Sequence, residues 1–375
     1  MSKIAVIHFA PLEIYPPVQN LVNLMSTACP NKKISVFTTR SVNYKLPVYN
    51  NEHNFINIHR FGRSGNRLKL LVRMWNYLKF YGCTLLYLVA ERPNRILYYE
   101  TISSFPAIFF KNLFKKNTEI FIHYHEYTSP SEYESGMKLG KVFHKLERKI
   151  YPLAKWVSHT NEQRMHLFEK DLLPVRLSQL KILPNYPPRS WLAEPAFKNS
   201  NLLRVVYIGA LSTETMFVKE FSSWVKQQRG FVSWDIYSYN VSPSTKEYLA
   251  EISEDVIKLK PGVCYSELPK ILEQYDVGII LYRGHIENYI YNATNKLFEY
   301  HSCGLDVWYP SGMDGINQYA RLDSIPKIVP INFELLSELD LRELKDHKNL
   351  PIKKSRFYCE DALKPLVSCL CGRSI

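Results

Sequence analysis

Residues 292–308 read NATNKLFEYHSCGLDVW, in which a polar loop opens a short helical stretch that ends at a Cys-Gly pair before an apolar strand. Thr294 or Asn295 can cap this helix, and Lys296 falls in its first turn. The first N–H groups of a helix lack intrahelical partners, so such a helix start can bind a diphosphate. Glu299 follows one turn later, where a carboxylate can accept hydrogen bonds from both hydroxyls of a ribose. An ordinary helix with a surface Lys and Glu has the same spacing, so the residues alone leave both interpretations open.

Apolar strand-like runs alternate with longer amphipathic stretches on both sides of this motif, a pattern typical of parallel sheets covered by helices. The predicted strands are residues 3–9, 33–38, 95–99, 119–124 and 156–159, and then 204–209, 233–237, 256–259 and 277–282. Residues 183–200 carry four prolines and no periodicity, as expected of a linker. We therefore predict an α/β protein with a first domain over 1–185 and a second over 201–350.

The length and amino-acid composition of the chain agree with two globular domains. A chain of 375 residues with 46% hydrophobic and 22% charged residues can bury two cores. Seven cysteines, an odd number without regular spacing, indicate no disulfide framework. No window offers the roughly 20 apolar residues of a membrane span, and the first ten residues lead straight into a strand pattern instead of a signal peptide. We expect a cytoplasmic protein.

The positive charge is concentrated in one half of the chain. Residues 1–185 contain 26 Lys and Arg against 12 Asp and Glu, whereas the remainder contains 22 against 23. This asymmetry favours an anionic partner for the first domain, such as a membrane surface, an acidic glycan or nucleic acid. Residues 63–81, RSGNRLKLLVRMWNYLKFY, have the composition of a basic amphipathic helix that can lie on an anionic leaflet. A helix packed on the sheet with a solvated basic face is the alternative.

Several stretches resemble GT-B glycosyltransferases related to family four. NKLFEYHSCGLDVW resembles the family's asparagine, lysine, aromatic, glutamate and Cys-Gly pattern. Other stretches match in the family's order, namely IAVIHFAPLEIYPPVQN with its Pro-Pro loop, HYHEYTSP, ILPNYP, VVYIGALS and YSELPKILEQYDVGIILY. The resemblance implies GT-B architecture, with two Rossmann-like domains facing a central cleft. The donor would bind to the second domain and the acceptor to the first, and residues 355–375 would form a last helix that is a candidate to return to the first domain.

The resemblance also implies a donor site, and the chain departs from it in two places. Many family members grip the diphosphate with an arginine directly after the domain-opening glycine and a lysine shortly after, but here Ala210 follows Gly209. Tyr291 stands where the family's second glutamate would be. Because a leaving diphosphate needs cationic stabilisation, Lys296 and Arg283 are the expected substitutes. The predicted donor-binding residues are Gly209, Arg283, Thr294, Asn295, Lys296 and Glu299.

Three side chains of the first domain are candidates for catalysis. His125 and Glu126 follow a predicted strand, the position from which α/β proteins present side chains to a ligand. Glu13 lies just before the Pro-Pro pair. If the enzyme retains configuration, as the resemblance implies, the leaving phosphate takes the acceptor proton and these residues position groups; if it inverts, one of them is the general base. His123 is predicted to be a core residue. We expect no metal, because no Asp-any-Asp pair is flanked by strand residues.

The predicted function is transfer of a sugar from a nucleotide-sugar to a glycan or lipid-linked glycan in bacterial surface polysaccharide biosynthesis. A nucleotide-sugar epimerase or phosphorylase of the same fold is the nearer alternative, although it leaves the basic first domain unexplained. A nucleic-acid-binding protein is the more distant alternative, since it would account for the charge but not for residues 292–308. No zinc finger or ribonucleoprotein strand is recognisable, so we expect no nucleic-acid partner.

Overall fold

The computed structural model of the protein describes residues 3–42, 48–49, 53–65, 68–136, 138–172, 178–193, 202–228, 230–252, 255–320, 325–342 and 354–373. The chain divides into two compact units. Unit 1 comprises Met1–Asn185 and Cys359–Ile375, and unit 2 comprises Tyr186–Tyr358. Each unit is an α/β fold built on one parallel sheet, which confirms the predicted fold class. The structure places the change of unit at Asn185 and again at Tyr358.

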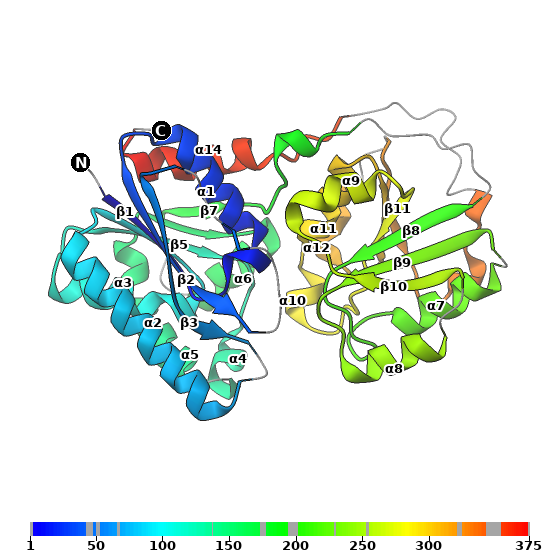
Figure 1. The fold of residues 1–375 in the computed structure, drawn as a ribbon, viewed down its shortest axis with the longest axis horizontal. Helices are drawn as coiled ribbons and strands as arrows, with labels where there is room; N and C mark the ends of the chain where they lie inside the picture. The colour runs from blue at the N-terminus through cyan, green and yellow to red at the C-terminus, as the bar shows by residue number, and fades with distance from the viewer. Residues whose placement is uncertain are drawn as a thin grey trace. The chain divides into compact units, whose positions relative to one another are not determined.

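Unit 1 contains a seven-stranded parallel sheet in the order β3-β2-β1-β4-β5-β6-β7 (Figure 1). Its strands are β1 Lys3–His8, β2 Lys33–Ser41, β3 Ile56–Ser64, β4 Arg95–Tyr99, β5 Glu119–Tyr124, β6 Trp156–His159 and β7 Leu180–Ile182. The chain moves outward from β1 to β3 and then returns to the other side of β1 with β4. The order therefore reverses between β1 and β4, and in open α/β sheets such a switch point is where ligands bind.

Helices cover both faces of this sheet. One face is covered by α2 Leu70–Glu91, α3 Ser104–Leu113, α5 Lys138–Ile150 and α6 Glu162–Leu172, whose buried side chains form one core with alternate strand residues. α1 Pro16–Ala28 and α14 Cys359–Cys371 pack together away from these helices (Figure 1). The shorter elements are α4 Pro130–Ser135 and the 3-10 turns η1 Leu12–Ile14, η2 Thr101–Ser103 and η3 Tyr151–Leu153.

The structure corrects three details of the sequence interpretation. The Pro-Pro pair does not form a loop; Pro16 and Pro17 open α1, because proline needs no N–H partner in the first helical turn. The basic helix does not begin at residue 63, since Arg63 belongs to β3 and α2 starts at Leu70. The sequence indicated no disulfide framework, but Cys29 is paired with Cys371 in a disulfide that joins the end of α1 to the end of α14. Their separation of 342 residues gives no spacing signal.

Unit 2 contains a six-stranded parallel sheet in the order β10-β9-β8-β11-β12-β13. Its strands are β8 Leu203–Ile208, β9 Val232–Ser238, β10 Ile257–Pro261, β11 Val277–Ile279, β12 Asp306–Pro310 and β13 Ile328–Ile331. α7 Val218–Gln227 and α8 Pro243–Glu251 share one core, and α9 Leu268–Leu272, α11 Asn295–Ser302 and α12 Asp314–Ala320 share a second one. α10 Glu287–Ile290 and the turns η4 Arg189–Trp191, η5 Tyr265–Glu267 and η6 Leu336–Glu338 complete the unit. The switch point of this sheet lies between β8 and β11.

Within the described ranges, none of the helices has the length and apolar character that crossing a bilayer requires. Residues 194–200 of the predicted linker and 343–350 of the predicted second domain lie outside those ranges.

Candidate functional site

The unit 2 switch point brings Gly209 and Lys296 together. Gly209 directly follows β8 and has a φ of +142°. A Cβ built on it would lie 2.7 Å from Cε and 2.9 Å from Nζ of Lys296. The ammonium group therefore lies directly over the backbone at the end of β8. Absence of a side chain at residue 209 is what leaves room for it.

Two tyrosine rings hold the Lys296 side chain in this place. Its Nζ donates a hydrogen bond to the hydroxyl of Tyr282 at 3.1 Å. The same nitrogen lies 5.6 Å from the ring centroid of Tyr207 and 5.4 Å from that of Tyr282, within the range of a cation–π contact. Tyr207 comes from β8 and Tyr282 follows β11, so the two strands that flank the switch point both position the cation.

The start of α11 lies at the same place and is fixed there by Tyr300. The hydroxyl of Tyr300 accepts a hydrogen bond from the backbone N–H of Ile208 at 2.9 Å. The Tyr300 ring packs so closely on β11 that a Cβ on Gly278 would come within 2.2 Å of it. Thr294, the N-cap, has extended backbone and makes no side-chain capping bond. Its hydroxyl does not compete for the first N–H groups of the helix, including that of Asn295.

Glu299 lies one turn along α11 and is 9% exposed. Burial raises the pKa of its carboxyl to about 7, and the positive charge of Lys296 opposes this rise. A carboxyl group with a pKa near 7 is partly ionised at neutral pH, and its carboxylate form can accept hydrogen bonds from two adjacent hydroxyls. The predicted pairing of Lys296 with Glu299 on one helix is thus geometrically present.

Arg283 is arranged differently from Lys296. Its guanidinium donates to the carboxylate of Glu220 on α7 at 2.5 Å and lies 4.4 Å from the ring centroid of Phe217. The structure therefore directs this side chain toward α7, and Arg283 would have to leave Glu220 to reach a diphosphate beside Lys296. The sequence did not reveal this direction of Arg283. Although Arg283 is next to Tyr282, successive side chains of an extended segment point to opposite sides.

The unit 1 switch point gathers His8, Tyr99 and His125 at the carboxyl ends of β1, β4 and β5. The ring of His125 stacks on that of Tyr99 with centroids 5.0 Å apart and an interplanar angle of 12°. The His8 ring lies 5.4 Å from Tyr99 and 6.0 Å from His125. His123 also belongs to this cluster, at 4.8 Å from His125, and is buried as predicted.

The backbone of His125 is held from both sides. Its N–H donates to the carboxylate of Glu100 at 2.6 Å, and its carbonyl accepts from the guanidinium of Arg164 at 2.6 Å. Burial lowers the pKa of the imidazole to about 4, with a smaller contribution in the opposite direction from Asn185 and in the same direction from Arg164. His125 is therefore neutral at physiological pH, and a neutral imidazole can exchange a hydrogen bond with a hydroxyl, although its burial disfavours protonation.

Glu100 is a site residue that sequence reasoning missed. It follows β4 with a φ of +60°, an uncommon conformation for a residue with a side chain. Burial, and next the charge of Glu126, raise the pKa of its carboxyl to about 8. The sequence could have indicated Glu100 by its position directly after a predicted strand, because residues at strand ends beside a switch point lie on the side of the sheet where ligands bind.

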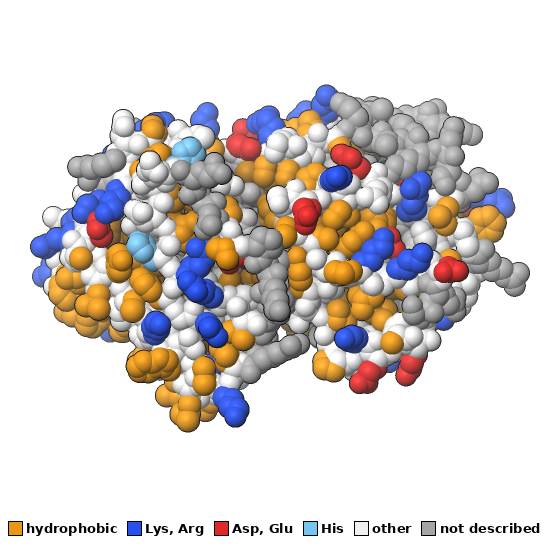
Figure 2. Space-filling model, viewed as in Figure 1, with side chains coloured by type: hydrophobic (Ala, Val, Ile, Leu, Met, Phe, Trp, Pro, Cys, Tyr) orange, Lys and Arg blue, Asp and Glu red, His pale blue; other side chains and the backbone are white. Residues whose placement is uncertain are grey.

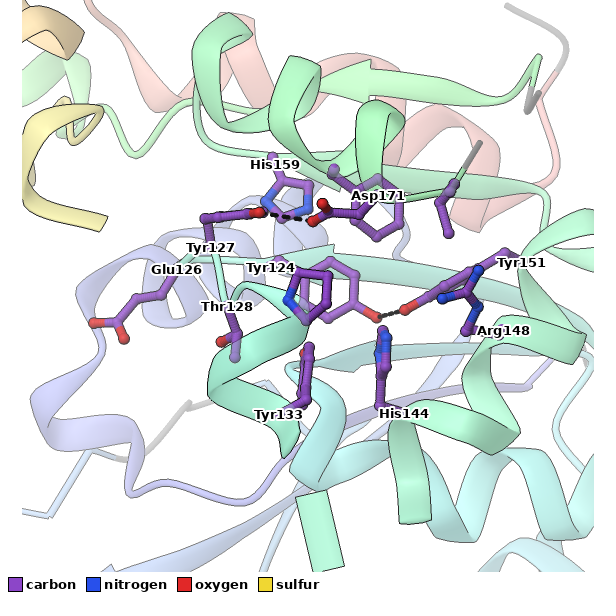
Figure 3. A pocket seen from close by; sticks show the side chains of 13 residues that line it. Tyr124, Glu126, Tyr127, Thr128, Tyr133, His144, Arg148, Tyr151, His159 and Asp171 are labelled. Atoms are coloured by element: carbon purple, nitrogen blue, oxygen red, sulfur yellow. Dashed lines mark hydrogen bonds between the residues drawn. The ribbon is translucent and has the colours of Figure 1, made fainter. Parts of the chain in front are cut away.

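Glu126 and Glu13 lie in different surroundings. Glu126 is exposed, and its carboxylate points away from the neighbouring aromatic side chains (Figure 3). Glu13 is engaged with Arg60, whose guanidinium donates to it at 2.9 Å, and with the backbone N–H of Tyr49 at 3.1 Å. Its neighbour Tyr15, not Glu13 itself, contacts the histidine cluster, with ring centroids 4.4 Å apart for Tyr15 and His8.

A pocket lies beside the carboxyl ends of β5 and β6, on the sheet face covered by α5 and α6 (Figure 3). The empty space around it is about 370 Å³, but this volume includes open solvent and the enclosed part is small. The ring of Tyr133 stacks on that of His144 at 3.9 Å, and the hydroxyl of Tyr127 donates to Asp171 at 2.6 Å. Both ring nitrogens of the buried His159 lack a hydrogen-bond partner among the described residues. The free space among these aromatic walls and unsatisfied polar groups is small, so it suits water or a single small polar group.

No group of three or more metal-ligating side chains occurs in the part of the chain that the structure describes.

Comparisons with known proteins identify the fold of the chain. No protein-family model matches the chain, and no curated protein matches it. Among solved structures, sucrose-phosphate synthase from Thermosynechococcus elongatus is 14% identical, with a TM-score of 0.66 over 99% of this chain and 96% of that one. HepE from Anabaena, solved in complex with UDP and glucose, is 12% identical with a TM-score of 0.63 over 98% and 95%. The UDP-GlcNAc 2-epimerase from Neisseria meningitidis, bound to UDP-GlcNAc, is 11% identical with a TM-score of 0.61 over 99% and 100%. The chain thus has the two-domain GT-B fold.

Proposed function

We propose that the protein is a nucleotide-sugar-dependent glycosyltransferase. The observation that carries the proposal is the position of Lys296, over Gly209 and at the start of α11, with Glu299 one turn away. A cation beside the first N–H groups of a helix fits a diphosphate, and a carboxylate one turn further fits a ribose. This cluster contains five of the predicted donor residues, namely Gly209, Thr294, Asn295, Lys296 and Glu299. Arg283 is bonded to Glu220 and would reach the diphosphate only after leaving it.

Departure of the nucleoside diphosphate is the step that these residues would assist. Negative charge grows on the leaving phosphate as the glycosidic bond breaks, and a fixed ammonium group stabilises that charge without reorganisation. Lys296 is already held by Tyr207 and Tyr282, so little side-chain ordering is needed when the donor binds. The helix start adds hydrogen bonds to the same phosphates.

The acceptor side belongs to unit 1. His125 is neutral and buried in the histidine cluster, so it can orient an acceptor hydroxyl or the donor sugar. If the reaction retains configuration, the leaving phosphate takes the proton. If it inverts, Glu126 is a better candidate base than His125, whose buried imidazole resists protonation, or Glu13, which is paired with Arg60.

The cellular role follows from chemistry and charge. A glycan or lipid-linked glycan acceptor in bacterial surface polysaccharide biosynthesis accounts for the basic unit 1, and in this proposal the enzyme works in the cytoplasm at the inner membrane face. We also propose that no metal is required, because Lys296 and the helix start supply the positive charge that a divalent ion would otherwise provide. Donor turnover should then be unchanged by EDTA, and a loss that Mg²⁺ or Mn²⁺ restores would reject this part of the proposal.

A nucleotide-sugar epimerase is the second candidate, because UDP-GlcNAc 2-epimerases are among the structures with this fold. The two activities separate in one assay. An epimerase converts the donor into a new nucleotide-sugar without a second substrate, whereas a transferase releases nucleoside diphosphate. Incubation of the protein with each nucleotide-sugar, with and without a glycan acceptor, followed by product chromatography, distinguishes them, because a transferase needs the acceptor to take the sugar whereas an epimerase changes the sugar without it.

Thermal stabilisation by nucleotides tests the donor site directly. We expect one class among uridine, guanosine, cytidine and adenosine diphosphates, with their sugars, to raise the thermal midpoint of the protein. Lys296→Ala and Glu299→Ala should abolish the rise. Lys246→Ala and Glu247→Ala, which change exposed residues of α8 in the same unit, are the matched controls and should preserve it. Absence of a rise with every nucleotide would reject the proposed function.

A further inference from the structure

The outer face of α2 carries a stripe of exposed apolar side chains. Leu71, Trp75, Leu78 and Leu86 are 78%, 66%, 64% and 71% exposed, respectively. Their spacing of four, three and eight residues places them on one side of a helix with 3.6 residues per turn. Gly82 continues the same line and is also exposed. The stripe therefore extends along most of this 22-residue helix.

The opposite side of α2 is also mostly apolar, because it packs on the sheet. Its buried residues are Asn76, Phe80, Tyr81, Thr84 and Leu88. A helix on the surface of a soluble domain normally pairs one apolar face with a polar one. An exposed stripe of large side chains opposite a buried face indicates a second apolar or partly apolar environment.

The neighbouring helix enlarges this apolar surface. α3 packs beside α2, and its end exposes Phe109, Leu113 and Phe114 at 36%, 63% and 44%. Figure 2 shows hydrophobic side chains gathered over α2 with Lys and Arg side chains among them. We call the exposed apolar residues of α2 and of the end of α3 the α2–α3 surface.

Basic residues predominate around the α2–α3 surface, and Glu91 at the end of α2 is paired with Lys3 and Lys33. Between Leu70 and Ala90 the only charged residues are Arg73 and Lys79. Lys115 and Lys116 follow α3. Large apolar side chains combined with basic ones match an anionic phospholipid bilayer, in which the apolar groups enter the acyl boundary and the cations remain at the phosphates. The excess of 26 Lys and Arg over 12 Asp and Glu in residues 1–185 adds longer-range attraction.

We propose that α2 docks the protein on an anionic membrane, lying flat on it with Leu71, Trp75 and Leu78 in the headgroup and acyl boundary. The proposal rests on the proposed glycosyltransferase function, for which it identifies an anionic membrane as the partner. The vesicle experiments below do not depend on nucleotide binding. Failure of either proposal can therefore be recognised separately.

Trp75 is a built-in reporter for this docking. The chain has six tryptophans, and the other five are between 0% and 7% exposed. Vesicles of phosphatidylcholine and phosphatidylglycerol in a 3:1 ratio should shift the emission to shorter wavelength and protect it from acrylamide. Pure phosphatidylcholine vesicles should do so much less, and raising the salt concentration should weaken the effect by screening the charges. Trp75→Phe should still bind in a flotation assay while losing the shift, which assigns the signal to α2.

Substitution of the stripe gives the second test. Leu71→Ser with Leu78→Ser should lower vesicle partitioning by about tenfold or more, since two side chains no longer enter the acyl boundary. Phe231→Ser, which removes a 60% exposed side chain from unit 2, is the matched control and should bind as the wild type does. Unchanged partitioning of the double variant, or no binding by the wild-type protein at low salt, overturns the proposal. A wild-type dimer that the double variant converts to a monomer, without an effect on vesicles, would assign the surface to a second copy instead.

Discussion

Lys296 occupies the space that a side chain at position 209 would need, with its Nζ only 2.9 Å from a Cβ built on Gly209. The two residues are 87 positions apart in sequence, but β8 and α11 meet at the switch point of the sheet. A single glycine therefore determines whether the cation can lie over the end of β8. This relationship explains why a chain without the basic residues that commonly follow this glycine can still have a fixed positive charge there.

Gly209→Ala should consequently weaken both nucleotide binding and the fold. The new methyl group meets the flexible end of Lys296, which can move away, and the φ of +142° adds strain of about 1–2 kcal/mol. We expect the apparent Kd for the best nucleotide to rise about tenfold, measured by titration calorimetry. An unchanged Kd would show that Lys296 does not contact the nucleotide from this position. The Ala210→Gly variant, one residue away, is the control and should bind normally.

Glu299 gives the protein a pH dependence whose sign is defined. Its pKa of about 7 in the folded protein exceeds the ordinary value of 4.5, so the folded state binds the proton more tightly than the unfolded state. Stability from this group is present below pH 4.5 and is lost as the pH rises through about 7. Glu299→Gln should therefore gain thermal stability relative to wild type between pH 5 and pH 8 in the absence of nucleotide. Parallel midpoints of the two proteins across this range would show that Glu299 is not buried as described.

His125→Ala should separate catalysis from donor binding. General acid–base and positioning residues contribute about 10²–10⁴-fold, so we expect release of nucleoside diphosphate to slow by about 100-fold or more. The nucleotide-induced rise in the thermal midpoint should remain, because His125 belongs to unit 1 and Lys296 to unit 2. His166→Ala, on α6, is the matched histidine control. Full activity of His125→Ala would leave the histidine cluster with a packing role only.

The sequence predicted those parts of the site that a strand end or a helix start fixes locally. Gly209 follows a continuous apolar strand, and the capping pattern at Thr294 marks the start of α11. Both features depend on a few adjacent residues, so they can be recognised without knowledge of the tertiary structure. The parallel direction of the strands follows from the alternation of strands and helices, whereas the strand order that creates the switch points was seen only in the structure.

Pairing between distant segments could not be predicted in the same way. Arg283 contacts Glu220, and Glu13 contacts Arg60, through partners 63 and 47 residues away. The strand β3 was missed because its alternating INIHRFGRS pattern mixes apolar, polar and basic residues, as an edge strand does. Periodicity identifies elements, whereas the orientation of one charged side chain depends on which neighbour the fold supplies.

Gly278→Ala tests whether packing of α11 positions the donor site. A Cβ at this β11 position would lie 2.2 Å from the ring of Tyr300, which is buried and cannot move aside. We expect a loss of stability of about 1–3 kcal/mol from overpacking, and loss of the nucleotide effect because α11 shifts. The double variant Gly278→Ala with Tyr300→Leu should recover part of the stability, measured by urea unfolding. An equally unstable double variant would locate the clash elsewhere.

Glu147 offers the last test, at a buried carboxyl group beneath the unit 1 pocket. It accepts hydrogen bonds from the hydroxyls of Thr101 at 2.7 Å and Tyr124 at 2.9 Å, yet burial raises its pKa to about 7. Because the folded pKa exceeds the ordinary one, its ionisation costs stability as the pH rises from 4.5 through about 7. Glu147→Gln keeps an acceptor and removes the charge, so it should be close to wild type at pH 5 and more stable at pH 8. Glu147→Ala leaves both hydroxyls without their partner and should cost about 2–4 kcal/mol at either pH. If Glu147→Gln were instead less stable at pH 8, the ionised carboxylate would be the form that the tyrosine hydroxyls stabilise.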